Sequence, residues 1–420
     1  MMEIKKGVYL HMMQSDKFKD IGISIRFLTG LDQRTATLRS LLALMLIDRC
    51  EKYPSKKAMS DKQDTLYGLS LRAQTVGYGK AQVLELRCKV LDPIYIEQDE
   101  TLLHDVICYL QEVVCHPFLT QEAFQEARSI LQAKMLRMQD DPAQYVINEG
   151  LKRAGKGTPL AVSSLGDLDI LDTLTLDDLI QVHKKLVAED RIDFVICGNF
   201  DQQDMQTLIT TYMPLAKRTD TYETHYVNSL KEPAKTEEIT RDIQQSSIFM
   251  LWQTNTDICD EEYYALRCAC AMLGQYPSSL LFQEVREKHS LCYSIYANLI
   301  SFDGALGVST GVEKKDIEQA VALIKVQFER LCTGDFDDAL LQVTKVMILN
   351  SLAATKDAMN SLMAHAYQNA VLKQEISIDE RMKRMQAVTK DQVMAVLQKC
   401  QLCLTFILSG KEDENETNQE

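Results

Sequence analysis

The chain has 420 residues, more than one ordinary hydrophobic core requires, so its length predicts two or three domains. Its composition, 46% apolar and 25% charged residues, is that of a soluble globular protein. The net charge of −14 argues against the basic surface with which a protein recognises nucleic acid or anionic lipid. We therefore expect neither a nucleic-acid nor a membrane partner.

The N-terminal segment lacks the apolar stretch of a secretory signal, and the longest apolar run, "LLALMLI" at 41–47, is too short to span a bilayer. A cytoplasmic location is expected. Most of the 12 cysteines lie in apolar segments and are expected to be small buried hydrophobes, among them Cys88, Cys108, Cys197 and Cys270. Cys400 and Cys403 form a CxxC without a second pair, which favours core packing over a metal or redox role.

In the first half, the alternating segment 23–30 predicts a strand, and 37–50 predicts a helix after it. A long amphipathic helix is expected at 122–141. The segment 174–186, "LTLDDLIQVHKKL", predicts another helix, and the strand "IDFVICGN" follows it.

The second half repeats this order. A strand is expected at 246–254, a helix at 260–273 with Asp260 as its N-cap, and a long helix at 337–359. The segment 388–400, "VTKDQVMAVLQKC", aligns without gaps on the helix at 174–186 and also precedes a strand that ends in Gly. Each copy has Thr at the N-cap and Asp in the first turn: Thr175 with Asp177, and Thr389 with Asp391.

Internal duplication of this kind predicts an α+β fold of two homologous domains. Each domain is expected to be a mainly antiparallel sheet with helices packed on one face. The predicted N-terminal domain is 1–215, the polar stretch 216–238 is the predicted linker, and 239–410 is the predicted C-terminal domain. The acidic tail 411–420 has no apolar residue and is expected to be disordered.

The segment 280–299, "LLFQEVREKHSLCYSIYANL", begins in helical order and ends in strand-like alternation. Arg286 and Tyr293 stand seven residues apart, on either side of a short polar turn. A guanidinium and a phenol in this arrangement predict a clamp for a polar group. Without further information, a surface arginine and a tyrosine of the sheet would be the simpler interpretation.

This segment resembles the second-domain signature of the pitrilysin/insulinase-type zinc metallopeptidases, LFxxIREKxGLxYxVxS. The stretches "HPFLTQEAFQEARSILQAKMLRMQDDP" and "TPLAVSSLGDLDILDTLTLDDLIQVHKKL", with the closing "GN", also resemble that family, in the same order and over nearly the whole chain. The resemblance implies a clamshell fold in which this chain forms half of a chamber. Within the family, the chain resembles degenerate bacterial members associated with 5-aminopentanol modification of elongation factor P.

The family's chemistry requires an inverted HxxEH motif and a distal Glu, because two His and one Glu hold zinc while the middle Glu activates water. The alignment places the motif on Ser40, Ala43 and Leu44, and the distal Glu on Lys134. None of these residues can perform the family role. The resemblance therefore implies a member with no catalytic residue, no metal at this position and no cofactor.

A shifted alignment does not restore the zinc motif, because no two of the seven His are three or four residues apart. A nucleophile pair of Ser40 and His11 has no supporting feature, since a Ser on an amphipathic helix is ordinarily polar surface. Leu44 belongs to a wide apolar stripe and is expected on the buried face of its helix.

In the family, an Arg and a Tyr of the second domain reach the substrate at the zinc of the first. The resemblance assigns these substrate-binding roles to Arg286 and Tyr293. Ser290 stands where the family has Gly, and His289 replaces a residue that is often basic. If this turn requires a positive φ, Ser290 strains it and re-aims Tyr293.

Three classes of function follow. The first is a non-catalytic subunit that binds a polypeptide substrate for a zinc-bearing paralogue, as a heterodimer or homodimer. The second is a stand-alone peptide-binding accessory or scaffold protein without any proteolytic role. The third, an enzyme of unrelated chemistry in the same fold, has no supporting set of residues in the sequence.

Overall fold

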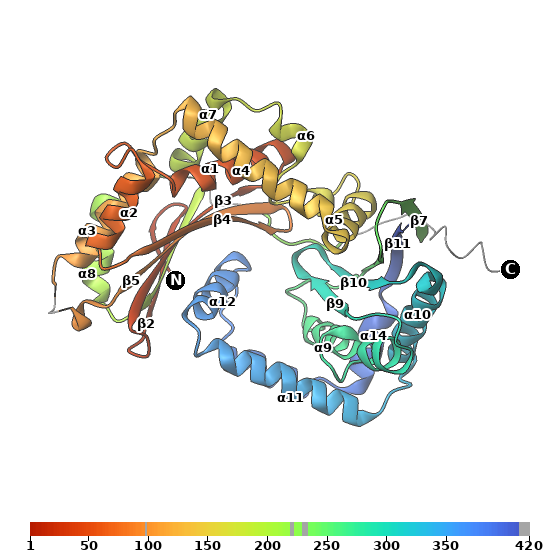
Figure 1. The fold of residues 1–420 in the computed structure, drawn as a ribbon. Helices are drawn as coiled ribbons and strands as arrows, with labels where there is room; N and C mark the ends of the chain where they lie inside the picture. Colours follow the sequence, from red (N-terminus) through yellow and green to blue (C-terminus); the bar gives the residue numbers. More distant parts are fainter. Residues whose placement is uncertain (97–98, 219–221, 229–233, 411–420) are drawn as a thin grey trace. The chain divides into compact units, whose positions relative to one another are not determined.

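The computed structural model describes residues 1–96, 99–218, 222–228 and 234–410, so the predicted acidic tail lies outside the described residues. The chain divides into two compact units, each built on one mixed β-sheet packed with helices (Figure 1). The predicted α+β class, with two mainly antiparallel sheets, is confirmed.

The first unit contains residues 1–135, 162–224 and 354–376. Its sheet is antiparallel except between β2 and β6, which run parallel. In spatial order, the strands are β1 (Met2–Lys5), β2 (Val8–Gln14), β6 (Arg191–Gly198), β3 (Asp20–Gly30), β5 (Ala81–Leu91) and β4 (Ser70–Tyr78).

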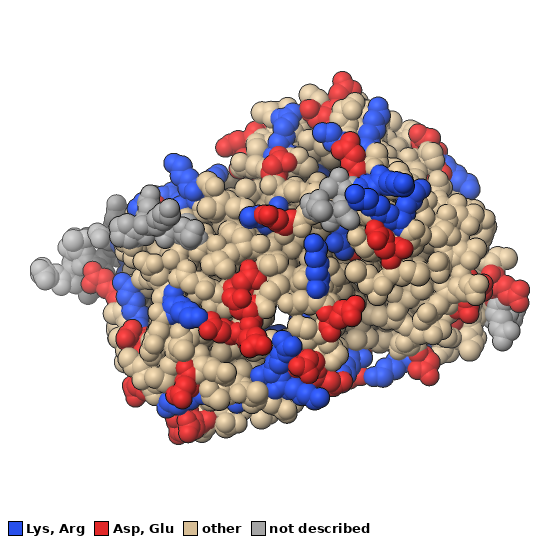
Figure 2. Space-filling model, turned by 180° about the vertical axis from the view of Figure 1, so that it is seen from behind, with Lys and Arg blue, Asp and Glu red and all other residues tan. Residues whose placement is uncertain are grey.

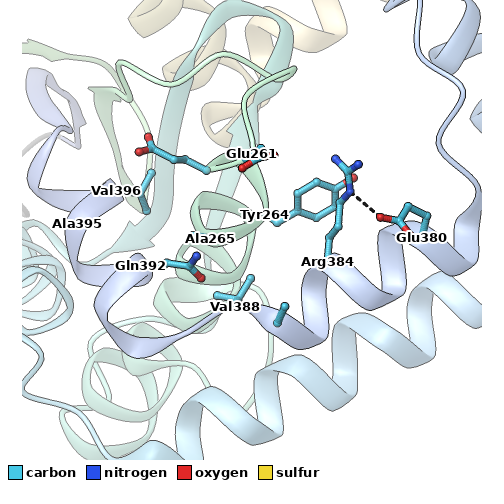
Figure 3. Close-up of a pocket in the computed structure, with 11 residues that line it drawn as sticks. Glu261, Tyr264, Ala265, Glu380, Arg384, Val388, Gln392, Ala395 and Val396 are labelled. Atoms are coloured by element: carbon cyan, nitrogen blue, oxygen red, sulfur yellow. Dashed lines mark hydrogen bonds and ion pairs between the residues drawn. The ribbon is translucent and has the colours of Figure 1, made fainter.

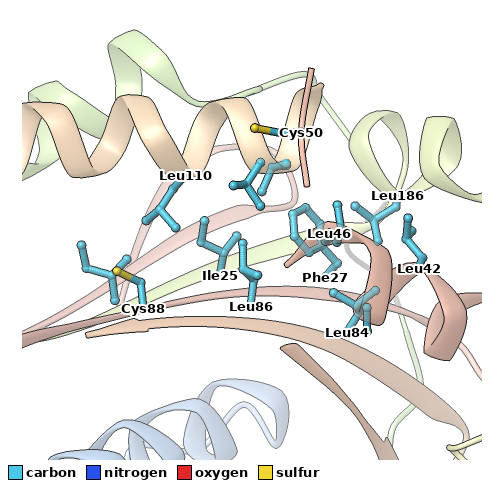
Figure 4. Close-up of a cluster of buried hydrophobic side chains, with 14 of the residues drawn as sticks. Ile25, Phe27, Leu42, Leu46, Cys50, Leu84, Leu86, Cys88, Leu110 and Leu186 are labelled. Carbon is cyan, nitrogen blue, oxygen red and sulfur yellow. The ribbon is translucent and has the colours of Figure 1, made fainter. Parts of the chain in front are cut away.

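One face of this sheet is apolar and packs against most of the helices of the unit. Figure 4 shows this core, in which Ile25, Phe27 and Leu86 of the sheet meet Leu42 and Leu110 of the helices. The helices are α1 (Gln33–Leu46), α2 (Lys56–Thr65), α3 (Leu102–Cys115), α4 (Gln121–Asp140, whose end belongs to the second unit), α6 (Leu168–Leu171), α7 (Leu176–Ala188), α8 (Gln202–Tyr212) and α12 (Met359–Val371).

Among the described residues, the second unit contains 136–161, 225–228, 234–353 and 377–410. Its sheet is also antiparallel, except that β7 runs parallel to β11. In spatial order, its strands are β7 (Lys235–Thr240), β11 (Gln401–Ser409), β8 (Ser246–Gln253), β10 (Ala305–Val312) and β9 (Ile295–Ile300). Its helices are α5 (Pro142–Ala154), α9 (Tyr263–Gly274), α10 (Ile317–Thr333), α11 (Asp338–Thr355), α13 (Ile378–Ala387) and α14 (Lys390–Gln398).

The duplication predicted from the sequence is visible in the strand order. The order β2-β6-β3-β5-β4 in the first unit corresponds strand by strand to β7-β11-β8-β10-β9 in the second. The two helices that align in the sequence, α7 and α14, both begin with a capping box, formed by Thr175 with Asp178 and by Thr389 with Gln392. The predicted N-caps are therefore confirmed.

The compact units are not consecutive stretches of the chain, unlike the predicted domains 1–215 and 239–410. Helix α5, from the first half of the sequence, packs on β8 and β11 of the second sheet. Gly150 permits its close approach, because a Cβ there would lie 2.4 Å from Cδ1 of Phe249. Helix α12, from the second half, packs on β6 and β3 of the first sheet.

Three details differ from the sequence predictions. Asp260 does not cap a helix: its carboxylate accepts the N–H of Asp257, and α9 begins only at Tyr263. The helix predicted at 337–359 ends at Thr355, and α12 begins after a short break. The described part of the predicted linker is packed rather than solvated, since Arg218 is buried and donates to four backbone carbonyls.

Within the described residues, no helix combines the length and apolar character needed to cross a membrane. On the face shown in Figure 2, acidic and basic side chains are interspersed. The described residues on that face form no broad basic area, in agreement with the negative net charge.

Candidate functional site

The structure brings Arg286 and Tyr293 together at the surface of the second unit. Arg286 lies on the π-helical turn Phe282–Lys288, and Tyr293 lies two residues before β9. The guanidinium carbon is 5.3 Å from the centre of the Tyr293 ring and 4.3 Å from that of Phe282. Tyr293 is 84% exposed, and among the described residues no hydrogen bond engages its hydroxyl. An exposed phenol donor therefore lies beside a guanidinium that is 33% exposed and has Glu287 Oε1 at 3.6 Å from its Nε.

In the turn between Arg286 and Tyr293, Ser290 has the positive φ that the sequence analysis named as a condition for strain. Ser290 has φ +53°, in the left-handed region that disfavours side chains with a Cβ. Two backbone hydrogen bonds hold this conformation, from Ser290 N–H to the Arg286 carbonyl and from Leu291 N–H to the Val285 carbonyl, both 3.1 Å. The turn is thus kept in spite of the serine.

The Ser290→Gly variant should be more stable than the wild-type chain by about 0.5–1 kcal/mol, because glycine adopts a positive φ without steric cost. Equilibrium denaturation measures this difference. The matched control is Glu287→Gly, an exposed position in the π-helical turn, where glycine should destabilise. Equal destabilisation by the two changes would show that Ser290 is not strained.

The four positions that align with the zinc site lie on α1 and α4. Ser40 is only 4% exposed and its hydroxyl is 2.9 Å from that of Thr75, so the expectation that it is polar surface was wrong. Ala43 is also 4% exposed. Leu44 is half-buried rather than fully on the buried face, and Lys134 is exposed. None of the four offers a zinc ligand.

Nor does the structure pair Ser40 with His11. The Nε2 atom of His11 lies 2.8 Å from a carboxylate oxygen of Asp193, on the opposite face of the sheet from the apolar core. Asp193 is fully buried and accepts two hydrogen bonds of 2.8 Å from Arg191. Burial opposes ionisation of Asp193, but His11 and Arg191 outweigh it and lower the pKa of the carboxyl. His11 is therefore part of an ion-pair network.

This network extends across five strands of the first sheet. The registers place one row of polar side chains on adjacent strands: Tyr9, Asp193, Arg26, Glu85 and Gln74. Glu85 accepts hydrogen bonds from Arg26 at 2.8 Å and from Gln74 at 2.7 Å. The face of this sheet opposite the apolar core is thus charged and internally hydrogen-bonded.

Helix α12 covers this polar face. The Tyr367 ring lies 4.2 Å from the guanidinium carbon of Arg26 and meets Tyr78 edge-on at 5.6 Å. The Tyr367 hydroxyl is buried without a hydrogen-bond partner among the described residues, and burial raises its pKa well above the usual value. Sequence reasoning missed this network, although charged residues at alternate positions of buried strands, as in "RID" and "LELR", were a usable signal.

The Glu85→Gln variant should lose stability at neutral pH. Burial alone would raise the pKa of Glu85, but the charge of Arg26 and hydrogen bonds from Gln74, Arg87 and Ser24 lower it from 4.5 to about 2. This shift corresponds to about 3 kcal/mol of folding free energy. Because the folded-state pKa is depressed, the stabilisation is complete above pH 4.5 and is lost as the pH falls toward 2.

Urea denaturation at a series of pH values tests this prediction. The stability difference between wild type and Glu85→Gln should shrink as the pH falls below 4.5. The exposed Glu375, changed to Gln, is the control and should have little effect at any pH. A difference that does not change with pH would mean that Glu85 acts through packing alone.

A cavity of about 470 Å³ lies elsewhere in the second unit, between α9, α13 and α14 (Figure 3). The charged residues that line it are three glutamates and one arginine: Glu261, Glu262, Glu380 and Arg384. Arg384 Nε is 3.0 Å from the Glu380 carboxylate, so its charge is already paired. The cavity contains neither Arg286 nor Tyr293, and its carboxylates suit a basic group rather than an anion.

All twelve cysteines are free thiols. Of the four named as buried hydrophobes, Cys88, Cys197 and Cys270 are buried as predicted, and Cys108 is half-buried. Burial raises the pKa of Cys400 to about 12 and also raises that of Cys403. The CxxC pair therefore packs as weakly acidic thiols, which supports the core-packing interpretation.

The amino-acid sequence of this chain is similar to those of known M16 proteins. Residues 173–346 match the family profile described as "Peptidase M16 inactive domain". The "Probable inactive metalloprotease YmfF" of Bacillus subtilis is 28% identical over 97% of this chain and 96% of its own length. The chain is therefore similar to M16 peptidases, and over nearly its whole length to one that is described as a probable inactive metalloprotease.

Solved structures show the same fold. A conserved protein from Enterococcus faecalis has a TM-score of 0.92 at 23% identity, and 99% of each chain is covered. The peptidase M16 inactive domain from Pseudomonas fluorescens has a TM-score of 0.80 at 18% identity, with 97% of each chain covered. The chain therefore has the fold of these proteins, in agreement with the predicted α+β class.

At the positions that align with the zinc motif of the M16 peptidases, this chain carries other residues. Two of the aligned positions, Ser40 and Ala43, are now part of the packed first unit. Lys134 places a cation where the M16 peptidases require a metal-binding carboxylate. Arg286 and Tyr293, in contrast, occur with the spacing of the resemblance and lie beside each other, Tyr293 exposed and Arg286 half-buried.

Proposed function

We propose that this chain is the non-catalytic subunit of a two-chain metallopeptidase-like complex, in which it binds a polypeptide substrate for a zinc-bearing paralogue. The observation that carries the proposal is the exposed Tyr293 beside a half-buried Arg286, in a chain with no zinc ligands at the M16 position. A substrate-binding pair in a chain without a zinc site can contribute to hydrolysis if another chain supplies the zinc site.

The chemistry of the pair fits a peptide. The Arg286 guanidinium offers several fixed N–H donors to a peptide carbonyl or carboxylate, and the Tyr293 hydroxyl can donate to an oxyanion that develops there. Tyr293 is free to turn toward a ligand because it is largely exposed. Both groups assist hydrolysis only where another chain supplies the metal-activated water.

A second part of the proposal concerns the cellular process in which the complex acts. We propose that the complex contributes to modification of elongation factor P, as the degenerate bacterial members that this sequence resembles are associated with that process. The second candidate function is a stand-alone peptide-binding accessory protein.

Co-expression tests assembly. The partner is a member of the same family that retains HxxEH and the distal Glu, and the measurement is size-exclusion chromatography with light scattering. A mass equal to the partner plus the 47.8 kDa of this chain, or twice that sum, supports the proposal. Failure to co-elute with any metal-bearing paralogue would favour the accessory function.

A further inference from the structure

Three side chains with different metal-binding atoms meet in the second unit, outside the site described above. His225 lies in the connection between the sheets, and Asp257 and Cys259 lie in the loop between β8 and α9. His225 Nδ1 is 2.8 Å from Asp257 Oδ2, and His225 Nε2 is 3.7 Å from Cys259 Sγ. One ligand atom from each residue lies within 4.8 Å of the other two.

The backbone fixes these side chains independently of one another. Next to His225, the N–H of Tyr226 donates to the carbonyl of Phe302 at 3.1 Å. On the other side, Asp257 Oδ1 accepts the N–H of Cys259 at 2.8 Å, so its Oδ2 is left to face His225. Ile258 is 5% exposed and anchors the loop between the two ligands. Little rearrangement is then needed to bring the three ligand atoms around one ion.

We propose that His225, Asp257 and Cys259 bind a zinc ion, which would join the connecting segment to the loop before α9. Zinc takes imidazole nitrogen, thiolate sulfur and carboxylate oxygen in tetrahedral geometry, with bonds of about 2.0–2.3 Å. Such bonds place neighbouring ligand atoms about 3–4 Å apart. With a single imidazole nitrogen as ligand, the three ligand atoms already lie within 4.8 Å of one another. Magnesium and calcium are disfavoured because they select oxygen ligands.

The local charge favours a cation over a reactive thiol. The carboxylates of Asp257 and Asp260 lie on the same loop as Cys259, and Asp257 Oδ2 already faces His225. A divalent ion would remove the repulsion between thiolate and carboxylates and displace the thiol proton.

The chain contains a matched comparison. In α3, His104 Nδ1 is 3.1 Å from Asp105 Oδ1, and His104 Nε2 is 3.6 Å from Cys108 Sγ. These pairwise contacts resemble those of His225. Within the described residues, however, only the His225 group brings three such atoms within 4.8 Å of one another. Cys108 is therefore the control: it lies beside a histidine but belongs to no group of three potential metal ligands.

The experiment is a Co²⁺ titration of the full chain, followed by competition with Zn²⁺. The wild-type chain should bind about one ion, with the near-ultraviolet charge-transfer band of a thiolate ligand. Cys259→Ser should lose the band and weaken binding about a hundredfold, and His225→Gln should also weaken binding. Cys108→Ser should behave as wild type.

Two results would overturn the proposal: no thiolate band in the wild-type chain, or the same band in Cys259→Ser. Alkylation of Cys259 by iodoacetamide gives a second readout, since bound Zn²⁺ should protect it and an equal rate with and without Zn²⁺ would contradict the site. The Cys259→Ser chain should hold no tight zinc elsewhere, because Ser40, Leu44 and Lys134 provide no M16 metal site.

Discussion

Replacing Arg286 with Ala and Tyr293 with Phe should each reduce peptide turnover by the two-chain complex by about ten- to a thousandfold. This is the range for losing one donor that acts in the transition state. Tyr293→Phe removes only the hydroxyl, which has no hydrogen-bond partner among the described residues, so the fold should be unaffected. Arg286→Ala removes the guanidinium that lies over the Phe282 and Tyr293 rings.

Assembly with the paralogue should remain intact in both variants, which separates substrate handling from docking. Tyr296 is the matched control, because it lies on β9 and is 56% exposed. Tyr296→Phe should leave turnover within about twofold of wild type. If the double variant of Arg286 and Tyr293 turns over peptide at the wild-type rate, the pair is structural and the proposed clamp is wrong.

Restoring the M16 motif as Ser40→His, Ala43→Glu and Leu44→His should destabilise the chain by about 4 kcal/mol or more. Ser40 and Ala43 are each 4% exposed, so the larger polar side chains would overpack the helix and bury unpaired groups. The contact between the Ser40 and Thr75 hydroxyls would also be lost. The variant should have no peptidase activity while Lys134 remains.

The same three residue types can be placed on an exposed helix face as a control. Thr207, Thr210 and Thr211 of α8 have the same spacing and are exposed. Their replacement by His, Glu and His should change the free energy of unfolding by less than about 1.5 kcal/mol. Peptidase activity in the Ser40 variant would show that the distal ligand does not lie at Lys134.

The duplicated fold could be predicted because its signals are local. Thr175 and Thr389 mark the starts of equivalent helices through their capping boxes, and hydrophobic periodicity locates the strands that follow. The exchange of α5 and α12 could not be predicted, because it depends on contacts between residues far apart in the sequence, such as Gly150 with Phe249. The prediction of Asp260 as a helix N-cap was wrong because its carboxylate accepts the N–H of Asp257 instead.

Residues of the candidate site that are close in the sequence could be predicted from their spacing. Groups that the fold brings together from distant parts of the chain could not. The seven-residue interval from Arg286 to Tyr293 could be read from the sequence, whereas the positive φ of Ser290 was only a condition there and is established by the structure. His225 lies 32 residues before Asp257, with no motif to join them. Ser40 was placed at the surface from its residue type, but its hydroxyl contact with Thr75 allows it to be buried.

The most direct test of the account is a titration of the metal-bearing paralogue with this chain, in which hydrolysis of a fluorogenic peptide is followed at a fixed paralogue concentration. The account predicts no hydrolysis by this chain alone. It also predicts a rate that rises with added chain and saturates when the two are equimolar. Hydrolysis by this chain alone that a chelator abolishes, or a paralogue rate that added chain does not change, would contradict the account.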